Sequence, residues 1–204
     1  MDKLAEIASS LYAIAQNGLL FTQNDFDKQR YQQIQSIATA ILADKSNYTT
    51  DKITELFNYE KGYITPKVDV RGIVFKDDKI LLVKERSDGR WSLPGGWVEI
   101  NEAPSEAVCK EIYEESGFKT KAVKLMAVYD RNKHGHPHQI PHIYKLFFIC
   151  EITGGESKTS IETSEVRFFE QNELPELSQN RVVKSQINRA YEHKNNMTLP
   201  ADFD

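Results

Sequence analysis

The stretch KEIYEESG, residues 110–117, places three glutamates within five positions: Glu111, Glu114 and Glu115. If the stretch is helical, these are positions i, i+3 and i+4, so the carboxylates crowd one side and repel by about 0.2–0.5 kcal/mol per pair. A helix is expected over residues 103–117, because Pro104 suits a first helical turn and Gly117 suits a C-terminal cap. The sequence therefore predicts a helix that concentrates negative charge.

The phase of this helix turns the glutamates toward the protein. At about 100° per residue, an apolar face forms from Ala107, Val108 and Ile112. Glu111 and Glu115 project within that face, and Glu114 lies at its edge. A buried carboxylate needs a basic partner, a raised pKa or a cation, and Lys110 projects away from the Glu111–Glu115 line. A hard cation such as Mg²⁺ takes oxygen ligands, whereas a solvated acidic face is the alternative.

The spacing around this helix extends the pattern. Gly96 is followed after five residues by Glu102, and after seven more by the run KEIYEESGF. This resembles the signature of the Nudix hydrolases, which is glycine, five residues, glutamate, seven residues, and then Arg-Glu-apolar-any-Glu-Glu-any-Gly-apolar. Eight of the nine constrained positions match, and at the ninth Lys110 stands where the family has arginine.

The resemblance implies an α/β fold, a Nudix α/β/α sandwich with a mixed sheet, whose motif holds one or more divalent ions, Mg²⁺ or Mn²⁺, against a nucleotide diphosphate. The implied metal ligands are Glu111, Glu114, Glu115 and the backbone carbonyl of Gly95 or Gly96. The implied structural positions of the motif are Gly96, Glu102, Lys110 and Gly117. Glu102 is expected to pair with Lys110, whose ammonium is a point charge on a flexible stem and grips less rigidly than arginine.

The implied reaction splits the diphosphate of a nucleoside diphosphate linked to a group X, which gives a nucleoside monophosphate and phospho-X. Divalent ions neutralise phosphate oxygens, orient the nucleophile and lower the pKa of bound water. The predicted catalytic carboxylates are Glu111, Glu115 and Glu165. The general base stays open between Glu111 and the segment SIETSEV, residues 160–166, in which Glu165 is favoured over Glu162. For those two, surface carboxylates beside a strand are the alternative.

Other polar groups are candidates for substrate contact. Arg71 lies in the middle of a predicted strand and could meet a substrate phosphate, although an ion pair near Asp69 or with a motif glutamate explains it equally well. Three more candidates precede the glycine loop: Arg86, Arg90 and Trp91. Tyr129 is one of several aromatic residues that could hold a choline cation by cation–π contact.

The segment KHGHPHQIPH, residues 133–142, carries three histidines at alternate positions: His134, His136 and His138. Such a cluster could bind a soft metal, but the glycine and prolines between the histidines indicate a loop. A solvated loop is favoured over a zinc site, and a role in substrate recognition is the third interpretation.

Hydrophobic periodicity predicts a small all-α domain over residues 1–64. A first helix is expected to end at Gly18, a longer second one follows, and a short third one begins near Thr50. Gly62 and Pro66 then mark a domain boundary.

Residues 65–204 are expected to form the α/β domain. VDVRGIVF and KILLVKE predict a hairpin around the turn KDDK, and three further strands follow the glutamate helix. An amphipathic helix over residues 181–194 closes the chain.

Composition limits the partners. With 26 Lys and Arg against 30 Asp and Glu, the net charge is −4, which gives no broad attraction to nucleic acid or anionic membranes. No run approaches the ~20 apolar residues of a membrane span, and the N-terminus is too polar for a signal peptide. Cys109 and Cys150 are expected to be reduced thiols. These features predict a cytoplasmic protein that does not bind membranes.

The N-terminal helices, together with the segments GYITPKVDVRG and WSLPGGW, resemble a bacterial Nudix subgroup of CDP-choline pyrophosphatases and ADP-ribose pyrophosphatases. Its members imply a homodimer and a small nucleotide substrate, with CDP-choline, cleaved to CMP and phosphocholine, as first choice. ADP-ribose, cleaved to AMP and ribose 5-phosphate, is second. An RNA-end-processing hydrolase and a non-catalytic nucleotide-sensing regulator are alternatives on the same scaffold.

Overall fold

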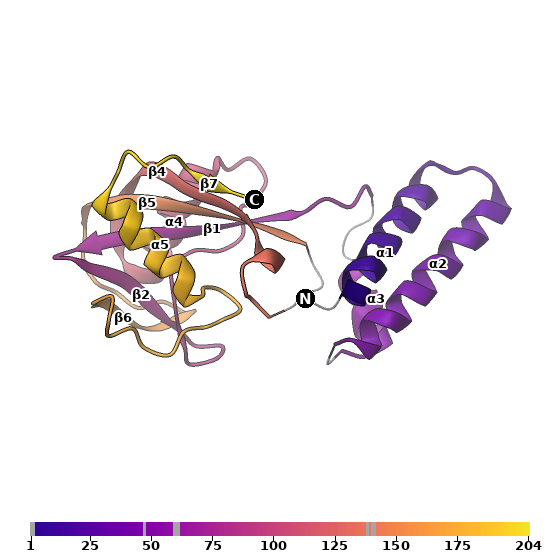
Figure 1. The fold of residues 1–204 in the computed structure, drawn as a ribbon, viewed down its shortest axis with the longest axis horizontal. Helices are drawn as coiled ribbons and strands as arrows, with labels where there is room; N and C mark the ends of the chain where they lie inside the picture. The colour runs from indigo at the N-terminus through magenta and orange to yellow at the C-terminus, as the bar shows by residue number, and fades with distance from the viewer. Residues whose placement is uncertain (1–2, 47, 59–61, 138, 140–141) are drawn as a thin grey trace. The chain divides into compact units, whose positions relative to one another are not determined.

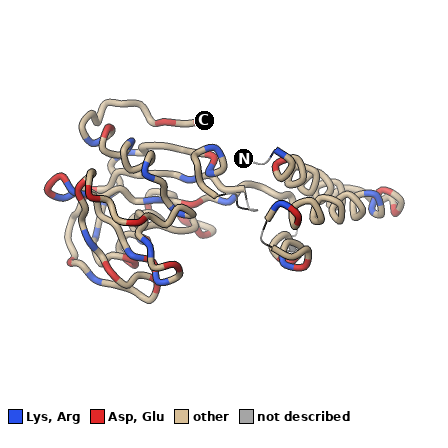
Figure 2. The backbone as a smooth tube through the Cα atoms, turned by 60° about the horizontal axis from the view of Figure 1, so that its bottom comes forward, with Lys and Arg blue, Asp and Glu red and all other residues tan. Residues whose placement is uncertain are grey.

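The computed structural model describes residues 3–46, 48–58, 62–137, 139 and 142–204. The chain divides into two compact units, the first within Met1–Pro66 and the second made of Lys67–Pro137 and His142–Asp204. The predicted boundary follows residue 64, and this division follows Pro66. Basic and acidic residues are interspersed along both units (Figure 2), in keeping with a net charge of −4.

The first unit contains helices α1 (Lys3–Phe21), α2 (Asp25–Asp44) and α3 (Thr50–Asn58) (Figure 1). Asn24 begins α2, because its side-chain oxygen accepts hydrogen bonds from the backbone N–H groups of Phe26 and Asp27. Small residues of α1 pack on α2 and α3 in a core that contains Ala5, Ala8, Tyr12, Ala38, Leu42 and Ile53. This confirms an all-α first unit.

Gly18 does not end the first helix, so that prediction is wrong. The helix α1 continues to Phe21, and Gly18 lies against the ring of Tyr31 on α2. A Cβ atom at Gly18 would stand 2.4 Å from that ring. The glycine is explained by the close approach of α1 and α2, which a pattern along one helix does not reveal.

The second unit contains both strands and helices (Figure 1). Its elements are β1 (Lys67–Lys76), β2 (Lys79–Glu85), β3 (Trp91–Ser92), α4 (Pro104–Ser116), β4 (Phe118–Asp130), the 3₁₀ turn η1 (Arg131–Lys133), β5 (Ile143–Gly155), β6 (Thr163–Phe169), α5 (Lys184–Asn195) and β7 (Asp202–Phe203). The strands form one sheet in the order β3-β2-β1-β5-β4-β7, and β6 pairs with β2. Because β1 runs parallel to β5 but antiparallel to β2, the predicted mixed sheet is confirmed.

The predicted hairpin is also confirmed. β1 and β2 pair from Phe75 opposite Ile80, and the turn between them holds Asp77 and Asp78 at positive φ values of 49° and 64°. Consecutive positive φ values are typical of tight two-residue hairpin turns.

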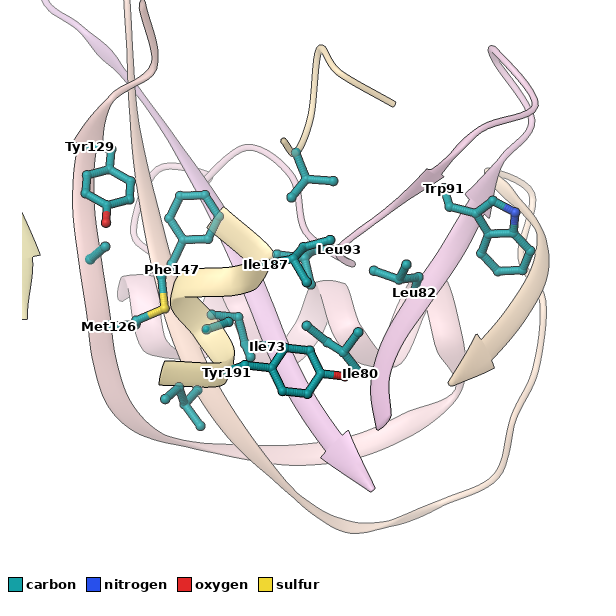
Figure 3. Close-up of a cluster of buried hydrophobic side chains, with 14 residues drawn as sticks. Ile73, Ile80, Leu82, Trp91, Leu93, Met126, Tyr129, Phe147, Ile187 and Tyr191 are labelled. Carbon is teal, nitrogen blue, oxygen red and sulfur yellow. The ribbon is translucent and has the colours of Figure 1, made fainter. Parts of the chain in front are cut away.

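The two helices cover opposite faces of this sheet. On one face, α4 packs against alternate β1 residues, including Val70 and Val74. On the other face, Ile187 and Tyr191 of α5 pack with Ile73, which has the opposite orientation in β1 (Figure 3). This strand alternation builds the α/β/α arrangement and decides which side chains reach α4.

Candidate active site

The glutamate helix α4 forms as the sequence predicts. Pro104 stands in its first turn, and Gly117 ends it with a left-handed φ of 79°. The predicted apolar face is buried, with Ala107, Val108 and Ile112 in the core. Glu115 is only 5% exposed, whereas Glu114 lies at the exposed edge.

Backbone hydrogen bonds attach the glycine loop to β1. The Gly72 N–H donates to the Pro94 carbonyl at 2.8 Å, and the Val70 N–H donates to the Gly96 carbonyl at 2.8 Å. Gly95 has a φ of 144°, and a Cβ atom there would stand 2.0 Å from the Val70 carbonyl oxygen. Only glycine fits so close to β1, and the loop is therefore held directly against this strand.

Two carboxylates of α4 meet this loop. The Glu115 carboxylate accepts a hydrogen bond of 2.9 Å from the Gly95 N–H. The Glu111 carboxylate lies against Gly96, where an added Cβ atom would stand 2.8 Å from Oε2 of Glu111. The spacing from Gly96 to Glu111 therefore places two glycines, which have no side chains, in contact with the carboxylates of α4.

These two carboxylates are poorly solvated. Burial raises the pKa of Glu111 to about 7, and the charge of Glu114 adds to the effect. Burial raises the pKa of Glu115 to about 8, and the charge of Arg71 only partly offsets it. A nearby cation would stabilise the ionised form of such carboxylates. Groups with strongly shifted pKa values often mark functional sites.

The donor set fits a hard divalent ion that keeps water and phosphate ligands. Within the described part of the chain, no three carboxylate, imidazole or thiol groups stand close enough to hold an ion by themselves. Mg²⁺ does not require such a cage, since it binds through one or two carboxylates together with water and substrate phosphates. The Gly96 carbonyl accepts from Val70, whereas the Gly95 carbonyl takes part in none of the hydrogen bonds of the described residues, which favours Gly95 as the loop ligand.

The expected ion pair behind the loop is present. Nζ of Lys110 lies 2.8 Å from Oε1 of Glu102 and 3.5 Å from Oε2 of Glu99. The Glu102 carboxylate also accepts from the Glu99 N–H at 3.4 Å. At position 110, where the family pattern has arginine, the lysine thus makes two single contacts to these carboxylates in place of a planar fork.

A loop over residues 156–162 is attached to the end of α4. The Lys158 N–H donates to the Ser116 carbonyl at 2.9 Å, and Oγ1 of Thr163 donates to the Glu115 carbonyl at 2.7 Å. The charge of Glu162 contributes to the raised pKa of Glu111. Glu162 therefore belongs to the surroundings of the glutamate helix.

Glu165, the favoured member of this segment, does not join the glutamates. Its carboxylate pairs with Lys84 at 2.8 Å and with Arg167. Its strand neighbour Val166 packs in the core of α4, so Glu165 faces the opposite, α5 side. The reason is the regular register of β6 with β2, in which Glu165 lies opposite Lys84 and alternates with Val166, so that both charged side chains project on the α5 side.

The predicted substrate-contacting residues lie in different surroundings. Arg71 is 5% exposed and donates to both oxygens of Asp69, at 2.9 and 2.7 Å. Lys145 donates to the same Asp69 at 2.7 Å. Arg71 therefore forms an ion pair near Asp69, as the alternative interpretation expected. It also donates to the Leu93 carbonyl at 3.2 Å, which anchors the start of the glycine loop.

Trp91 and Tyr129 belong to the core on the α5 side (Figure 3). Trp91 packs edge-on against Phe169, and the Tyr129 hydroxyl donates to Asp202 at 2.9 Å. The structure does not bring either residue to the glutamate helix, because both occupy strand positions of the opposite face. Arg86, by contrast, is exposed and donates to the Ser160 carbonyl at 3.3 Å, beside the 156–162 loop.

The histidines of residues 133–142 have separate partners. The His134 ring stacks on Tyr129 and lies 2.8 Å from Asp204. His136 is buried between the Gln179 carbonyl and Gln186, and burial lowers its pKa to about 4. His138 lies outside the described residues. The described histidines do not form a shared metal site.

Sequence reasoning missed the buried charges under the loop. Lys145 interrupts the apolar strand run IYKLFF, and this interruption was a signal for a buried ion pair. Glu85 is also buried, where it accepts from Ser92 at 2.6 Å and pairs with Arg181 at 3.0 Å. No local pattern distinguishes Glu85 from an exposed strand-end residue.

A family model described as the NUDIX domain matches residues 65–190. The chain belongs to the Nudix hydrolases. A second model, described as a UDP-X-like, N-terminal oligomerisation domain, matches residues 2–57. Nudix hydrolases generally use divalent metal ions, and the Nudix motif of this chain is the loop and helix described above.

Three relatives give the Nudix assignment more detail. YjhB of Bacillus subtilis (strain 168), provisionally named as an ADP-ribose pyrophosphatase, is 44% identical over 99% of this chain and 97% of its own length. An ADP-ribose pyrophosphatase of Methanocaldococcus jannaschii is 41% identical over 57% of this chain and 69% of its own. The crystal structure of a UDP-X diphosphatase aligns with a TM-score of 0.65 and 32% identity over 98% of both chains. Among the described helices, none is long and apolar enough to cross a membrane.

Proposed function

We propose that this Nudix hydrolase cleaves the diphosphate bond of a nucleoside diphosphate linked to X, with Mg²⁺ or Mn²⁺ as cofactor. The observation that carries the proposal is the contact of Glu111 and Glu115 with the glycine loop. Glu111, Glu115 and the Gly95 carbonyl would hold the ion directly, and Glu114, whose charge acts on Glu111 from the exposed edge of α4, would contribute through bound water. When bound, such an ion neutralises phosphate oxygens and lowers the pKa of bound water.

Protein groups around this site have distinct roles in the proposal. Arg71 and the β1 backbone hold the glycine loop in position. Glu162, whose backbone carbonyl accepts from the Arg86 N–H at 2.8 Å, lies on the loop beside Glu111 and is proposed to accept the proton of the attacking water. Glu111 is the second candidate for this base. Glu165 is engaged with Lys84 and Arg167 on the other face.

ADP-ribose is the substrate that we propose first. The names of the Bacillus and Methanocaldococcus relatives support it, so it takes precedence over CDP-choline, the first choice from sequence. CDP-choline remains the second candidate. The core position of Tyr129, stacked on His134, removes one aromatic residue that was considered for a choline cation.

The test is a substrate panel with Mg²⁺ or Mn²⁺. It contains ADP-ribose, CDP-choline, a UDP-sugar, NADH, a dinucleoside polyphosphate, an oxidised dNTP and a short RNA. We expect ADP-ribose to give AMP and ribose 5-phosphate in a reaction that EDTA stops. Preferred cleavage of RNA would support the RNA-end-processing alternative, and no turnover of any compound would support the regulator.

We also propose that the first unit makes a homodimer. Ile7, Leu11 and Ile14 form an exposed apolar stripe on α1, beside the face that carries its buried alanines. Exposed apolar patches commonly mark contact surfaces, and the match to an N-terminal oligomerisation domain supports this use. Light scattering should give a dimer for the wild type and a monomer for Ile14→Glu. A monomeric wild type would contradict the proposal. The cytoplasmic location expected from sequence stays a prediction.

A further inference from the structure

Trp97 is a large side chain left accessible beside the glycine loop. It follows Gly96 directly in the chain and is 47% exposed, whereas Trp91, the other of the two tryptophans, is 7% exposed in the core. None of the roles described above uses Trp97. Accessible tryptophans are enriched where proteins contact other molecules, so a tryptophan next to the candidate ion site is a candidate for substrate contact.

Strand pairing determines the side on which Trp97 projects. Trp97 forms an antiparallel bridge with Asp69 of β1, and residues directly opposite in such a pair have their side chains on the same face. The next residue along each segment, Val98 and Val70, packs in the core of α4. Because successive side chains of an extended segment alternate, Trp97 and Asp69 both project on the side of the sheet away from α4.

The candidate ion site lies at the outer edge of the same loop. The carbonyls of Pro94 and Gly96 point toward β1, from which each accepts a hydrogen bond of 2.8 Å. The Gly95 N–H points away from β1 and donates to Glu115. Since peptide groups of an extended segment lie near the plane of the sheet, an ion bound at this edge lies between the side that α4 covers and the side on which Trp97 projects.

A substrate bound to this ion can extend to Trp97. Gly95 and Trp97 are two residues apart, so their Cα atoms are at most about 7 Å apart. In a nucleotide, one ribose joins the base to the phosphate. The base therefore has to extend along only two residues of the loop to meet the indole ring, which belongs to the same segment of chain as the proposed ion ligand.

Buried charges beside Trp97 favour a neutral ring over a cationic group. Asp69 accepts hydrogen bonds from Arg71 and from Lys145, at 2.7 Å each, and its charge also acts on Arg131. All four side chains are buried. Three basic groups thus share one carboxylate, and this excess of positive charge opposes the approach of a quaternary ammonium such as choline. A neutral base is not opposed in this way.

We propose that the indole of Trp97 stacks on the base of the substrate and so sets the affinity for its nucleoside half. The inference rests on the proposed function, because that function places the diphosphate on an ion at Gly95 and the α4 carboxylates. Every base has a π face, and stacking on an aromatic side chain therefore supplies affinity without selecting one base. The phospho-X half then lies on the other side of the ion.

The first test compares steady-state kinetics of Trp97→Ala, Trp97→Phe and wild type on the best substrate of the panel. We expect Trp97→Ala to raise KM about tenfold with kcat within about threefold, because stacking holds substrate and transition state alike. Trp97→Phe keeps an aromatic ring and should stay within about threefold of wild type in both constants.

Phe203→Ala is the matched control. It removes another exposed aromatic side chain, from β7, which β5 and β4 separate from β1 in the sheet. We expect it to change neither constant. An unchanged KM in Trp97→Ala, or an equal rise of KM in Phe203→Ala, would overturn the proposal.

The second test detects the contact without turnover, by tryptophan fluorescence. AMP, CMP and UMP are titrated into wild type and Trp97→Phe with Mg²⁺, and calorimetry measures binding in parallel. At least one nucleotide should quench wild type saturably. The same nucleotide should still bind Trp97→Phe without quenching it, because only the buried Trp91 remains. Ribose 5-phosphate has no base and should not quench wild type.

Three results of this titration would overturn the proposal. The first is that no nucleotide binds wild type. The second is that a nucleotide binds wild type without quenching its fluorescence, and the third is that quenching persists in Trp97→Phe.

The two proposals fail in different ways. If conjugates are hydrolysed but Trp97→Ala leaves KM unchanged, the stacking assignment is wrong and the proposed function stands. If no conjugate is hydrolysed while nucleotides still quench Trp97, the proposed function is wrong and Trp97 remains part of a nucleotide site.

Discussion

The Gly95 N–H donates to the Glu115 carboxylate at 2.9 Å, so the glycine loop and the glutamate helix are directly joined. Beside this bond, Glu111 occupies the space that a side chain at position 96 would need. The two contacts explain the spacing between the two glycines of the loop and the glutamates of α4. They also make the loop a sensitive place to test the site.

Gly96→Ala should reduce kcat/KM by about tenfold or more with little change in fold, because its Cβ would meet the Glu111 carboxylate at 2.8 Å and displace it. Circular dichroism and steady-state kinetics would measure both effects. Gly154→Ala is the control, since a Cβ there would meet nothing within 4 Å. Equal activity of the two variants would show that the position of Glu111 does not matter.

Glu162→Gln should lower kcat substantially, while Glu165→Gln should leave it within about threefold, because a general base contributes about 10²–10⁴-fold and, of the two, Glu162 is the one whose charge acts on Glu111. Both substitutions remove one charge from the same segment, so each controls for the other. The reverse ranking would restore the base favoured from sequence. If kcat is unchanged in both variants, Glu111 is the remaining candidate for the general base.

Lys110→Arg should keep or raise the melting temperature and activity, because arginine can make the same contact to Glu102 with a planar fork. Lys110→Met removes the charge but keeps much of the stem, and it should lower activity by loosening the loop. Scanning calorimetry and kinetics would compare the three proteins. A loss in Lys110→Arg as large as in Lys110→Met would show that the pair with Glu102 is not what position 110 supplies.

Mg²⁺ should stabilise the protein more at about pH 8.5 than at about pH 6. In the metal-free protein, burial raises the pKa of Glu111 from 4.5 to about 7 and that of Glu115 from 4.5 to about 8. The folded state therefore holds more protons than the unfolded state between these values, so metal-free stability falls as pH rises through them. A bound ion competes with those protons, and its effect grows as they leave.

Melting temperatures with and without MgCl₂ at both pH values would measure this difference. A double variant, Glu111→Gln with Glu115→Gln, should lose both the Mg²⁺ effect and its pH dependence. An equal Mg²⁺ shift at both pH values would mean that the ion binds elsewhere.

Local and periodic features of the fold were predictable from sequence. The helix over residues 104–116 has its start, end and buried face marked by Pro104, Gly117 and the apolar residues between them. The hairpin of β1 and β2 is similarly marked by its strands and its Asp77–Asp78 turn. These signals act between residues that are close in the chain, so one sequence contains them completely.

Contacts between distant segments were not predictable in the same way. Gly18 is a glycine because Tyr31 of another helix meets it, and Glu165 turns away from α4 because β6 pairs with β2 in the register that sets Glu165 opposite Lys84. Trp91 and Tyr129 lie in the opposite core because strand alternation assigns them to that face. A motif indicates which of its residues act together. For residues outside the motif, the orientation of the side chain depends on strand pairing, which a single sequence does not reveal.

The most direct measurement is the turnover of Glu115→Gln beside wild type, on the best substrate of the panel with Mg²⁺. Glutamine keeps an oxygen for the Gly95 N–H, which now donates to Glu115 at 2.9 Å, but it removes the charge that would hold an ion. We expect turnover to fall at least about a hundredfold while the melting temperature of the metal-free protein is kept. Near-normal turnover in the folded variant would contradict the assignment of the α4 carboxylates as the metal site.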